Sequence, residues 1–145
     1  MTMIIKAFIE SPQNSDTSYK YNEEKLVLKS ESKLPARYPY SYGFVPKTRA
    51  EDNDCVDVYV IDNIEADTGD YYEGSILGLL EFWEDEEEDH KILIGPENMI
   101  ISEEIVQTLQ DFMTMVFKER PGKIIRFGKS HDKHEAIKYL QKSMI

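Results

Sequence analysis

The chain has 145 residues, of which 41% are hydrophobic and 31% are charged. This length is enough to bury one ordinary core, so we expect a single domain over residues 1–145. The formal net charge of −11 repels nucleic-acid backbones and anionic membrane surfaces, which excludes nucleic acid and membranes as expected partners.

Cysteine usage and hydropathy indicate the compartment. The single cysteine, Cys55, cannot form an internal disulfide, and the first twelve residues have neither a basic region nor a long apolar one. No stretch approaches the roughly 20 consecutive apolar residues that a membrane span needs. We therefore expect a cytoplasmic protein.

The first two thirds of the chain are expected to be rich in strands. An apolar run predicts a strand at Ile4–Glu10, and a hairpin over Lys20–Lys29 turns through residues 22–24. Further apolar runs predict buried strands, the last two joined by the acidic segment 84–89. These runs are Val56–Ile61, Ser75–Phe82 and His90–Ile94.

Two helices are expected in the last third. Ser102 is a suitable N-cap for the first, and Pro121 with Gly122 ends it. Its apolar residues fall on one face: Ile105, Leu109, Phe112, Met113 and Val116. The second helix is expected from about His131 to Lys142, with Ala136, Ile137 and Leu140 as its apolar positions. About five strands followed by two helices predict an α+β fold, a compact β-barrel with the helices against its side.

An acidic segment precedes the strand at residues 58–61. Asp52, Asp54 and Asp57 lie at the mouth of this strand, and carboxylate oxygens are the ligands that Mg²⁺ prefers. Three acids in six residues are more often a solvated loop, so the spacing alone leaves both interpretations open. A calcium loop is excluded, because a frame that starts at Asp52 has Asp57 where glycine is required.

The second acidic run, residues 84–89, has the same ordinary explanation, since hairpin tips collect charge. If the fold brings it beside the three aspartates, six or more carboxylates converge, and their repulsion requires bound cations. Basic and hydroxyl groups stand where strands or helices end, although each lysine alone is more often an ordinary surface residue. They are Lys20, Lys29, Tyr42, Lys91 and Lys118.

Residues 37–46, with the sequence RYPYSYGFVP, are followed by the acidic residues 51–57. In this order they resemble the core of the family I soluble inorganic pyrophosphatases, in which a Tyr-Pro pair precedes a Tyr-Gly pair and an aspartate triplet. The resemblance extends to the whole chain, somewhat shortened. It implies a five-stranded, OB-like β-barrel and Mg²⁺-dependent hydrolysis of inorganic pyrophosphate to two phosphates. It also implies a homo-oligomer, because members are commonly dimers or hexamers.

The resemblance also implies a role for individual residues. Asp54 matches the general base, Asp57 could bridge two ions, and a water between such ions loses a proton more easily than bulk water does. The residues that resemble metal ligands are Glu10, Asp52, Asp57, Glu84 and Asp89. Those that resemble the phosphate-binding set are Lys20, Lys29, Tyr42, Lys91 and Lys118. Several Mg²⁺ ions are expected as cofactors, with Mn²⁺ as an alternative.

Five positions depart from the family pattern. Lys29 stands in place of an arginine and exchanges a bidentate fork for a point charge, and Phe117 replaces a tyrosine and removes a hydroxyl donor. Glu84 replaces an aspartate, Cys55 a proline and Asn22 an acid. Two alternatives therefore accompany an active pyrophosphatase: an impaired pyrophosphatase-like protein that binds a metal–phosphate ligand, and a hydrolase of a larger phosphoanhydride.

Overall fold

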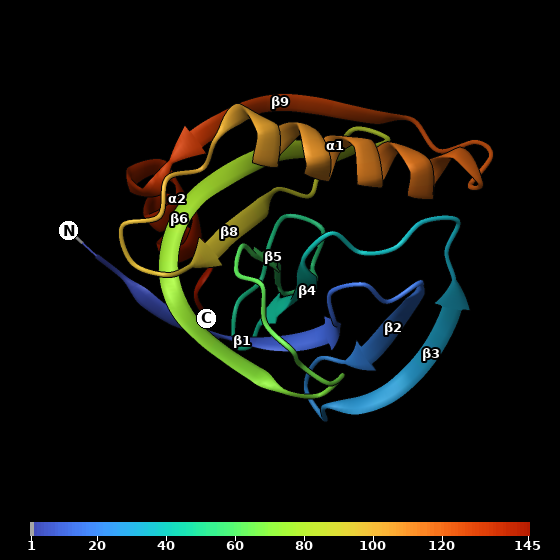
Figure 1. The fold of residues 1–145 in the computed structure, drawn as a ribbon, viewed down its shortest axis with the longest axis horizontal. Helices are drawn as coiled ribbons and strands as arrows, with labels where there is room; N and C mark the ends of the chain where they lie inside the picture. The colour runs from blue at the N-terminus through green and yellow to red at the C-terminus, as the bar shows by residue number, and fades with distance from the viewer. Residues whose placement is uncertain (1) are drawn as a thin grey trace.

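A strongly curved sheet forms the centre of the computed structural model, which describes residues 2–145 (Figure 1). Five of its seven strands close a ring of hydrogen bonds in the order β1-β4-β5-β8-β6 and back to β1. The ring strands are β1 (Ile4–Ser11), β4 (Ser41–Val45), β5 (Val56–Val60), β6 (Tyr71–Glu84) and β8 (Lys91–Gly95). The other two, β7 (Glu87–Glu88) and β9 (Ile125–Asp132), pair with β6.

The long strand β6 joins the two parts of the sheet. Its first residues pair with β1, which closes the ring, and its later residues pair with β8 and β9 on opposite edges. All ring pairings are antiparallel except β5 with β8, which run parallel with Asp57 opposite Lys91. This one parallel pair sets side chains from two distant parts of the sequence beside each other.

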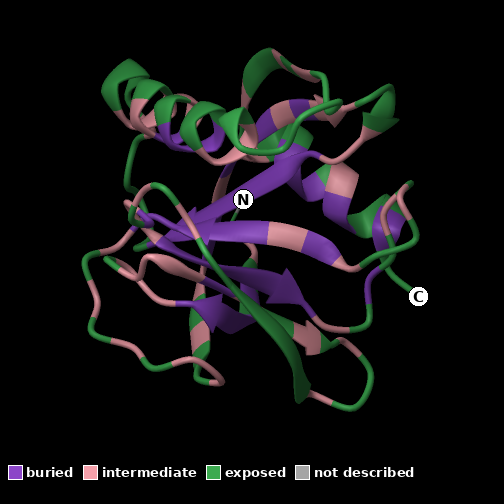
Figure 2. Cartoon of the chain, turned by 90° about the vertical axis from the view of Figure 1, so that its right-hand side faces the viewer, coloured by how far each residue is buried: buried purple, intermediate pink, exposed green. Residues whose placement is uncertain are grey.

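A separate two-stranded hairpin lies outside the ring. It consists of β2 (Thr17–Asn22) and β3 (Val27–Lys33), and every residue of β3 is exposed to solvent. The hairpin lies beside the end of β1, and in Figure 2 exposed residues dominate this part of the molecule, whereas buried residues gather on the ring strands. The hairpin is therefore a wall added to the sheet.

Two capped helices cover the sheet. In α1 (Glu103–Lys118), the Ser102 hydroxyl accepts a hydrogen bond from the Ile105 amide at 3.3 Å, as expected for an N-cap. In α2 (Lys133–Ser143), the Asp132 carboxylate accepts from the amides of His134 and Glu135. A side chain therefore satisfies one free amide at the start of α1 and two at the start of α2.

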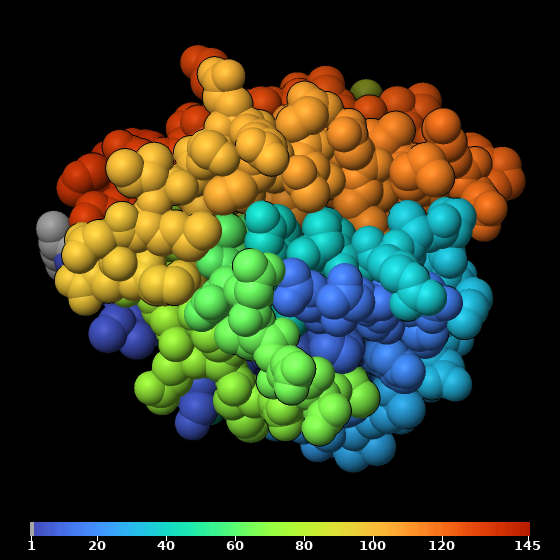
Figure 3. Space-filling model, viewed as in Figure 1, coloured from blue at the N-terminus to red at the C-terminus, as the bar shows by residue number. Residues whose placement is uncertain are grey.

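Each helix completes a different apolar core. The α2 residues Ala136, Ile137 and Leu140 pack on the inner residues of β1, β5, β6 and β8. The α1 residues Leu109, Phe112 and Met113 pack on a second cluster that contains several tyrosines. Figure 3 shows α1, in orange, against the segment before β4, in cyan, where the rings of Tyr38 and Phe112 lie 4.7 Å apart. Aromatic packing therefore fixes α1 over one end of the ring.

The expected α+β class is confirmed, with its strand-rich first part and its two helices. The sequence did not predict β9, and the second helix begins at Lys133, two residues later than expected, because β9 continues to Asp132. The residues of β9 are half-buried or exposed and rich in charge, so they carry little of the apolar signal of a strand. Their pairing with β6, a long-range contact, decides their conformation.

Within residues 2–145, no helix has the length and apolar character that a crossing of a lipid bilayer requires.

Gly43, in the Tyr-Gly pair of the motif, lies on β4 directly against the backbone of β1. A β-carbon at this position would lie 1.8 Å from the Phe8 carbonyl oxygen, which belongs to the backbone of the neighbouring strand. Because Ile9 and Gly43 are paired residues, that oxygen cannot move without separating the two strands. The glycine is therefore required by the closure of the ring.

We expect Gly43→Ala to lower the free energy of unfolding by at least about 4 kcal/mol, the range that marks disruption of a packed core. Urea denaturation followed by circular dichroism measures this change. Gly69→Ala is the comparison, since its nearest neighbour would lie 3.7 Å away and only its φ of +94° is unfavourable. It should cost about 1–2 kcal/mol. Equal losses in the two variants would contradict the steric explanation.

Candidate active site

One cavity of about 430 Å³ lies between the hairpin β2–β3, the end of α1 and the strands β5, β6 and β8. Seven carboxylates line it, so the two acidic runs of the sequence do converge. Ten of the eleven side chains expected from the sequence line this cavity: Glu10, Lys20, Lys29, Tyr42, Asp52, Asp54, Asp57, Glu84, Asp89 and Lys91. The eleventh, Lys118, is exposed at the last turn of α1 and is not among the lining residues.

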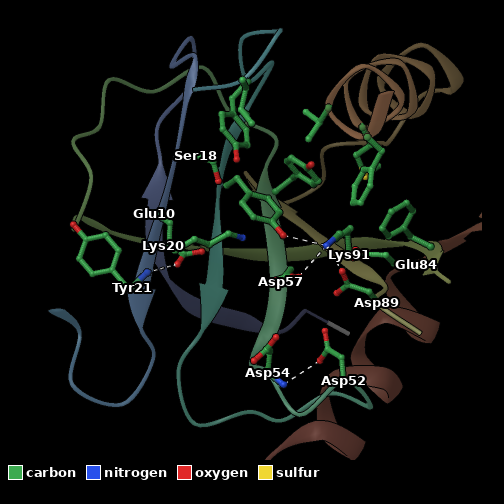
Figure 4. Close-up of a pocket in the computed structure, with 18 of the residues that line it drawn as sticks. Glu10, Ser18, Lys20, Tyr21, Asp52, Asp54, Asp57, Glu84, Asp89 and Lys91 are labelled. Carbon is green, nitrogen blue, oxygen red and sulfur yellow. Dashed lines mark hydrogen bonds and ion pairs between the residues drawn. The ribbon is translucent and has the colours of Figure 1, made fainter. Parts of the chain in front are cut away.

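Lys91 holds the centre of the cavity together (Figure 4). Its ammonium group donates hydrogen bonds to Asp57 Oδ2 at 2.9 Å, to Asp89 Oδ2 at 3.0 Å and to Tyr42 Oη at 3.0 Å. Its side chain is only 6% exposed, and the two carboxylates are 16% and 18% exposed. A buried charge is stable only when it is paired and hydrogen-bonded, and the three partners satisfy all three ammonium protons.

The two carboxylates differ in their affinity for protons. Burial raises the pKa of Asp89 to about 8. The charge of Lys91 opposes this rise, but the negative charge of Asp57 adds to it. Burial also disfavours the charged form of Asp57, but the charge and the hydrogen bond of Lys91 hold its pKa below the ordinary value. The two groups titrate as a unit in which Asp89 takes the proton first. The cavity therefore holds more negative charge than one lysine can neutralise.

A tight turn presents the acids that precede β5. Asn53 adopts a left-handed conformation with φ of +68°, which asparagine tolerates better than most residues do. The Asp54 amide donates to Asp52 Oδ1 at 3.0 Å, and the Asp54 carbonyl accepts from the Ala50 amide at 2.8 Å. Burial raises the pKa of Asp52 above its ordinary value, and Asp54 stays exposed. The turn therefore fixes both backbones and leaves the Asp54 carboxylate open to the cavity.

The hairpin β2–β3 supplies the opposite wall. Glu10, on β1, is 5% exposed and accepts a hydrogen bond from the Tyr21 amide at 3.0 Å (Figure 4). Burial raises the pKa of Glu10 to about 7, although this amide and the charge of Lys20 oppose the rise. Glu23 Oε1 accepts from the Cys55 amide at 3.0 Å, which ties the hairpin to the aspartate turn. Glu23, not Asn22, therefore makes this link.

Two charged groups of the cavity, Glu23 and Arg120, were not among the eleven side chains expected from the sequence. Arg120 lines the wall at the end of α1, together with Phe117. Arg120 follows the end of α1 at Lys118, so the helical spacing that identified the apolar face of α1 did not identify it. Glu84, on the same side of the cavity, forms an ion pair with Lys123 at 3.3 Å.

The donor set of the cavity fits hard cations such as Mg²⁺. Its seven carboxylates face four cationic groups, Lys20, Lys29, Lys91 and Arg120. Oxygen ligands in excess of positive charge, several with raised pKa values, are the environment in which a divalent ion is favourable. Within residues 2–145, no three acidic, His or Cys groups converge on a single point, since Lys91 lies between Asp57 and Asp89.

Comparison with known proteins decides the family. The family model described as inorganic pyrophosphatase matches residues 7–144. The chain belongs to this family. It is 30% identical over 140 residues to the inorganic pyrophosphatase of Sulfolobus acidocaldarius, an alignment that covers 95% of this chain and 79% of that protein. A shorter match to the inorganic pyrophosphatase of Saccharolobus solfataricus, 36% identical over 96 residues, covers 65% of this chain and 56% of that protein.

Solved structures agree with the family. An inorganic pyrophosphatase structure from Coxiella burnetii matches this pyrophosphatase with a TM-score of 0.88 at 28% identity, and the match covers 97% of this chain and 92% of that one. The resemblance expected from the sequence is confirmed. The chain is an inorganic diphosphatase that hydrolyses inorganic pyrophosphate, and enzymes of this family are generally metal-dependent.

Removal of the central ammonium should destabilise the metal-free pyrophosphatase. We expect Lys91→Met to lower the free energy of unfolding by about 3–5 kcal/mol, because Asp57 and Asp89 lose the charge that compensates their burial. Urea denaturation in the presence of a chelator measures this loss. Lys138→Met, which removes a charge that is 73% exposed, should change stability by about 0.5 kcal/mol or less. A small loss in both variants would contradict the central role of Lys91.

The stability of the metal-free pyrophosphatase should fall as the pH rises from about 4 to 8. Glu10 and Asp89 keep their protons to about 7 and about 8 in the folded chain, against ordinary values of 4.5 and 3.8. Between these values the folded state binds more protons than the unfolded state does, so raising the pH favours unfolding.

Urea denaturation at a series of pH values, with a chelator present, measures this slope. Glu10→Gln should flatten it between pH 5 and 7 by about the contribution of one proton. Glu104→Gln, at an exposed position in the first turn of α1, should leave it unchanged. A wild-type stability that rises through this range, or an unchanged slope in Glu10→Gln, would show that the buried carboxyls do not control it.

Proposed function

We propose that this pyrophosphatase binds magnesium pyrophosphate in the cavity and that Asp54 is the general base of hydrolysis. The observation that carries the proposal is the convergence of seven carboxylates and four cationic groups on one cavity of about 430 Å³. Pyrophosphate with its counterions needs both kinds of group: carboxylates for the metal ions and cations for the phosphate oxygens.

Asp54 is the acid best placed to accept a proton. Asp57 and Asp89 are both engaged by Lys91, whereas Asp54 is exposed and its backbone is held by the turn. Asp54 takes a proton from a water that attacks one phosphorus. The bond from that phosphorus to the bridging oxygen then breaks, and the departing phosphate carries away the electron pair. A positioned base of this kind typically contributes about 10²–10⁴-fold to the rate.

The cationic groups hold the phosphates. Lys20 and Lys29 on the hairpin and Lys91 at the centre face the same space and neutralise the charge of the bound and departing phosphates. Tyr42 is buried, and its hydroxyl oxygen accepts a hydrogen bond from Lys91, which fixes the direction of the hydroxyl group. We keep Lys118 as a candidate of this set on the family resemblance alone, because it is not among the lining residues.

The carboxylates of Glu10, Asp52, Asp57, Glu84 and Asp89 are the proposed ligands of several Mg²⁺ ions, with Mn²⁺ as an alternative. When bound, such ions neutralise phosphate oxygens and make a water easier to deprotonate. The raised pKa values of Glu10, Asp52 and Asp89 support this assignment, since burial penalises the charged form of each carboxyl and the positive charge nearby does not offset that penalty. Binding a cation would release their protons.

Four finer assignments follow from the family and are part of the proposal. The five-strand ring is an OB-like β-barrel, and residues 1–145 form a single domain. The enzyme acts in the cytoplasm and assembles as a homo-oligomer. Family membership supports each of these assignments, and the closed order of ring strands supports the first.

Phosphate release from pyrophosphate during a Mg²⁺ titration tests the proposal. Wild-type activity should require Mg²⁺, and Asp54→Asn should reduce kcat by about 10²–10⁴-fold, because asparagine cannot accept the proton. Asp111→Asn, on the exposed face of α1, is the matched control and should retain wild-type kcat.

Two other outcomes have definite meanings. An unchanged kcat in Asp54→Asn would assign the base to another carboxyl of the cavity. A wild type that binds magnesium pyrophosphate without releasing phosphate at any Mg²⁺ concentration would support the impaired, ligand-binding alternative. Faster hydrolysis of triphosphate or a nucleoside triphosphate than of pyrophosphate would support the larger substrate.

A further inference from the structure

The end of α1 presents an arginine to the cavity. Arg120 is the one arginine among the cavity-lining residues of the described chain, residues 2–145, and it is exposed. The residues beside it on this wall are apolar: Met113, Val116 and Phe117. On this wall, Arg120 is therefore the side chain that can donate hydrogen bonds to a phosphate oxygen.

The turn that carries Arg120 is tied down on both sides. The Arg120 amide donates to the Phe117 carbonyl at 3.1 Å, and the Arg120 carbonyl accepts from the Lys123 amide at 3.3 Å. Lys123 in turn forms ion pairs with Glu84 at 3.3 Å and Asp85 at 3.4 Å. The amides of Asp85 and Ile124 complete the link, because each donates to the other residue, at 2.7 and 2.9 Å. The position of Arg120 is thus fixed relative to the end of β6.

An aromatic pair supports the guanidinium. The Arg120 guanidinium carbon lies 4.9 Å from the centre of the Phe117 ring, which packs at 5.7 Å on the ring of Phe82. Lys91 Nζ lies 5.4 Å from the centre of the Phe82 ring. Two aromatic rings therefore separate the two cations along one wall. Stacking on an aromatic face holds a guanidinium plane in place and leaves the edge that carries its donors free.

The other cations of the cavity differ from Arg120. Lys91 already donates all three of its protons, to Asp57, Asp89 and Tyr42. Lys20 and Lys29 belong to the hairpin on the opposite wall and offer point charges. Only the guanidinium offers two parallel donors to one phosphate. Among the described residues, it also forms no ion pair within 4.0 Å that would compete with a substrate.

We propose that Arg120 is a substrate-binding residue of this pyrophosphatase, which binds one phosphate of pyrophosphate through its guanidinium fork from the wall of α1. The inference rests on the proposed site. Arg120 performs there the phosphate contact that the family resemblance expects of Lys118. Arg120 contributes to substrate binding and stabilises the leaving phosphate, whereas Asp54 accepts the proton.

The test compares Arg120→Gln, Arg120→Lys and Lys118→Gln, with Lys138→Gln on α2 as a control for the loss of one charge. Calorimetry measures the dissociation constant of imidodiphosphate, a nonhydrolysable analogue, in the presence of Mg²⁺. Phosphate release measures KM and kcat separately. Urea denaturation checks that each variant is folded.

We expect Arg120→Gln to weaken imidodiphosphate binding and to raise KM by about tenfold, the effect of losing one hydrogen bond to a charged group. Arg120→Lys should lie between this variant and the wild type, because it keeps the charge and loses the fork. Lys138→Gln should bind as the wild type does. A merely structural role of Arg120 would change stability without this pattern of binding constants.

Wild-type affinity in Arg120→Gln overturns the inference, as does a loss confined to Lys118→Gln. Neither result affects the proposed function, which depends on wild-type turnover. If instead the wild type binds imidodiphosphate but does not release phosphate from pyrophosphate, the proposed function fails, and the binding constants still decide the role of Arg120.

Discussion

The ammonium group of Lys91 is the element on which the site depends. It donates hydrogen bonds to two carboxylates that would otherwise repel each other, and to the Tyr42 hydroxyl. It can do so because β5 and β8 are the one parallel pair of the ring and place Asp57 directly opposite Lys91. A lone ammonium balances only one of the two charges, so burial, together with the negative charge of Asp57, raises the pKa of Asp89.

The other walls of the cavity add further positive charge around the carboxylates. The hairpin brings Lys20 and Lys29 to one side, and the turn after α1 brings Arg120 to the other. These groups lie on exposed segments, whereas the carboxylates are mostly attached to the ring strands or next to them. The sheet therefore holds the groups whose geometry matters most to phosphoryl transfer, and the hairpin and the turn after α1 carry positive charge toward the substrate.

Much of this could be predicted from the sequence because its signals are local. The capping serine at 102 and the apolar spacing that follows define α1, and the run at 56–61 defines β5. Four of the ten expected residues that line one cavity, Tyr42, Asp52, Asp54 and Asp57, belong to a motif whose order and spacing are specific, and the resemblance along the rest of the chain supplied the other six. The strand β9 could not be predicted, because its pairing with β6, and not its own composition, makes it a strand. Arg120 was missed because a lone arginine after a helix has no distinguishing pattern.

The sequence by itself determined the family, the α+β class and the residue types that the chemistry uses. Only the tertiary structure decided that Lys91 lies between Asp57 and Asp89, that Glu23 ties the hairpin to the aspartate turn, and that Arg120 faces the cavity. The physical reason is how far apart in the sequence the contacting residues lie. Composition, capping and spacing act within a few residues, whereas a parallel strand register and the wall of a cavity join segments that are distant in the chain.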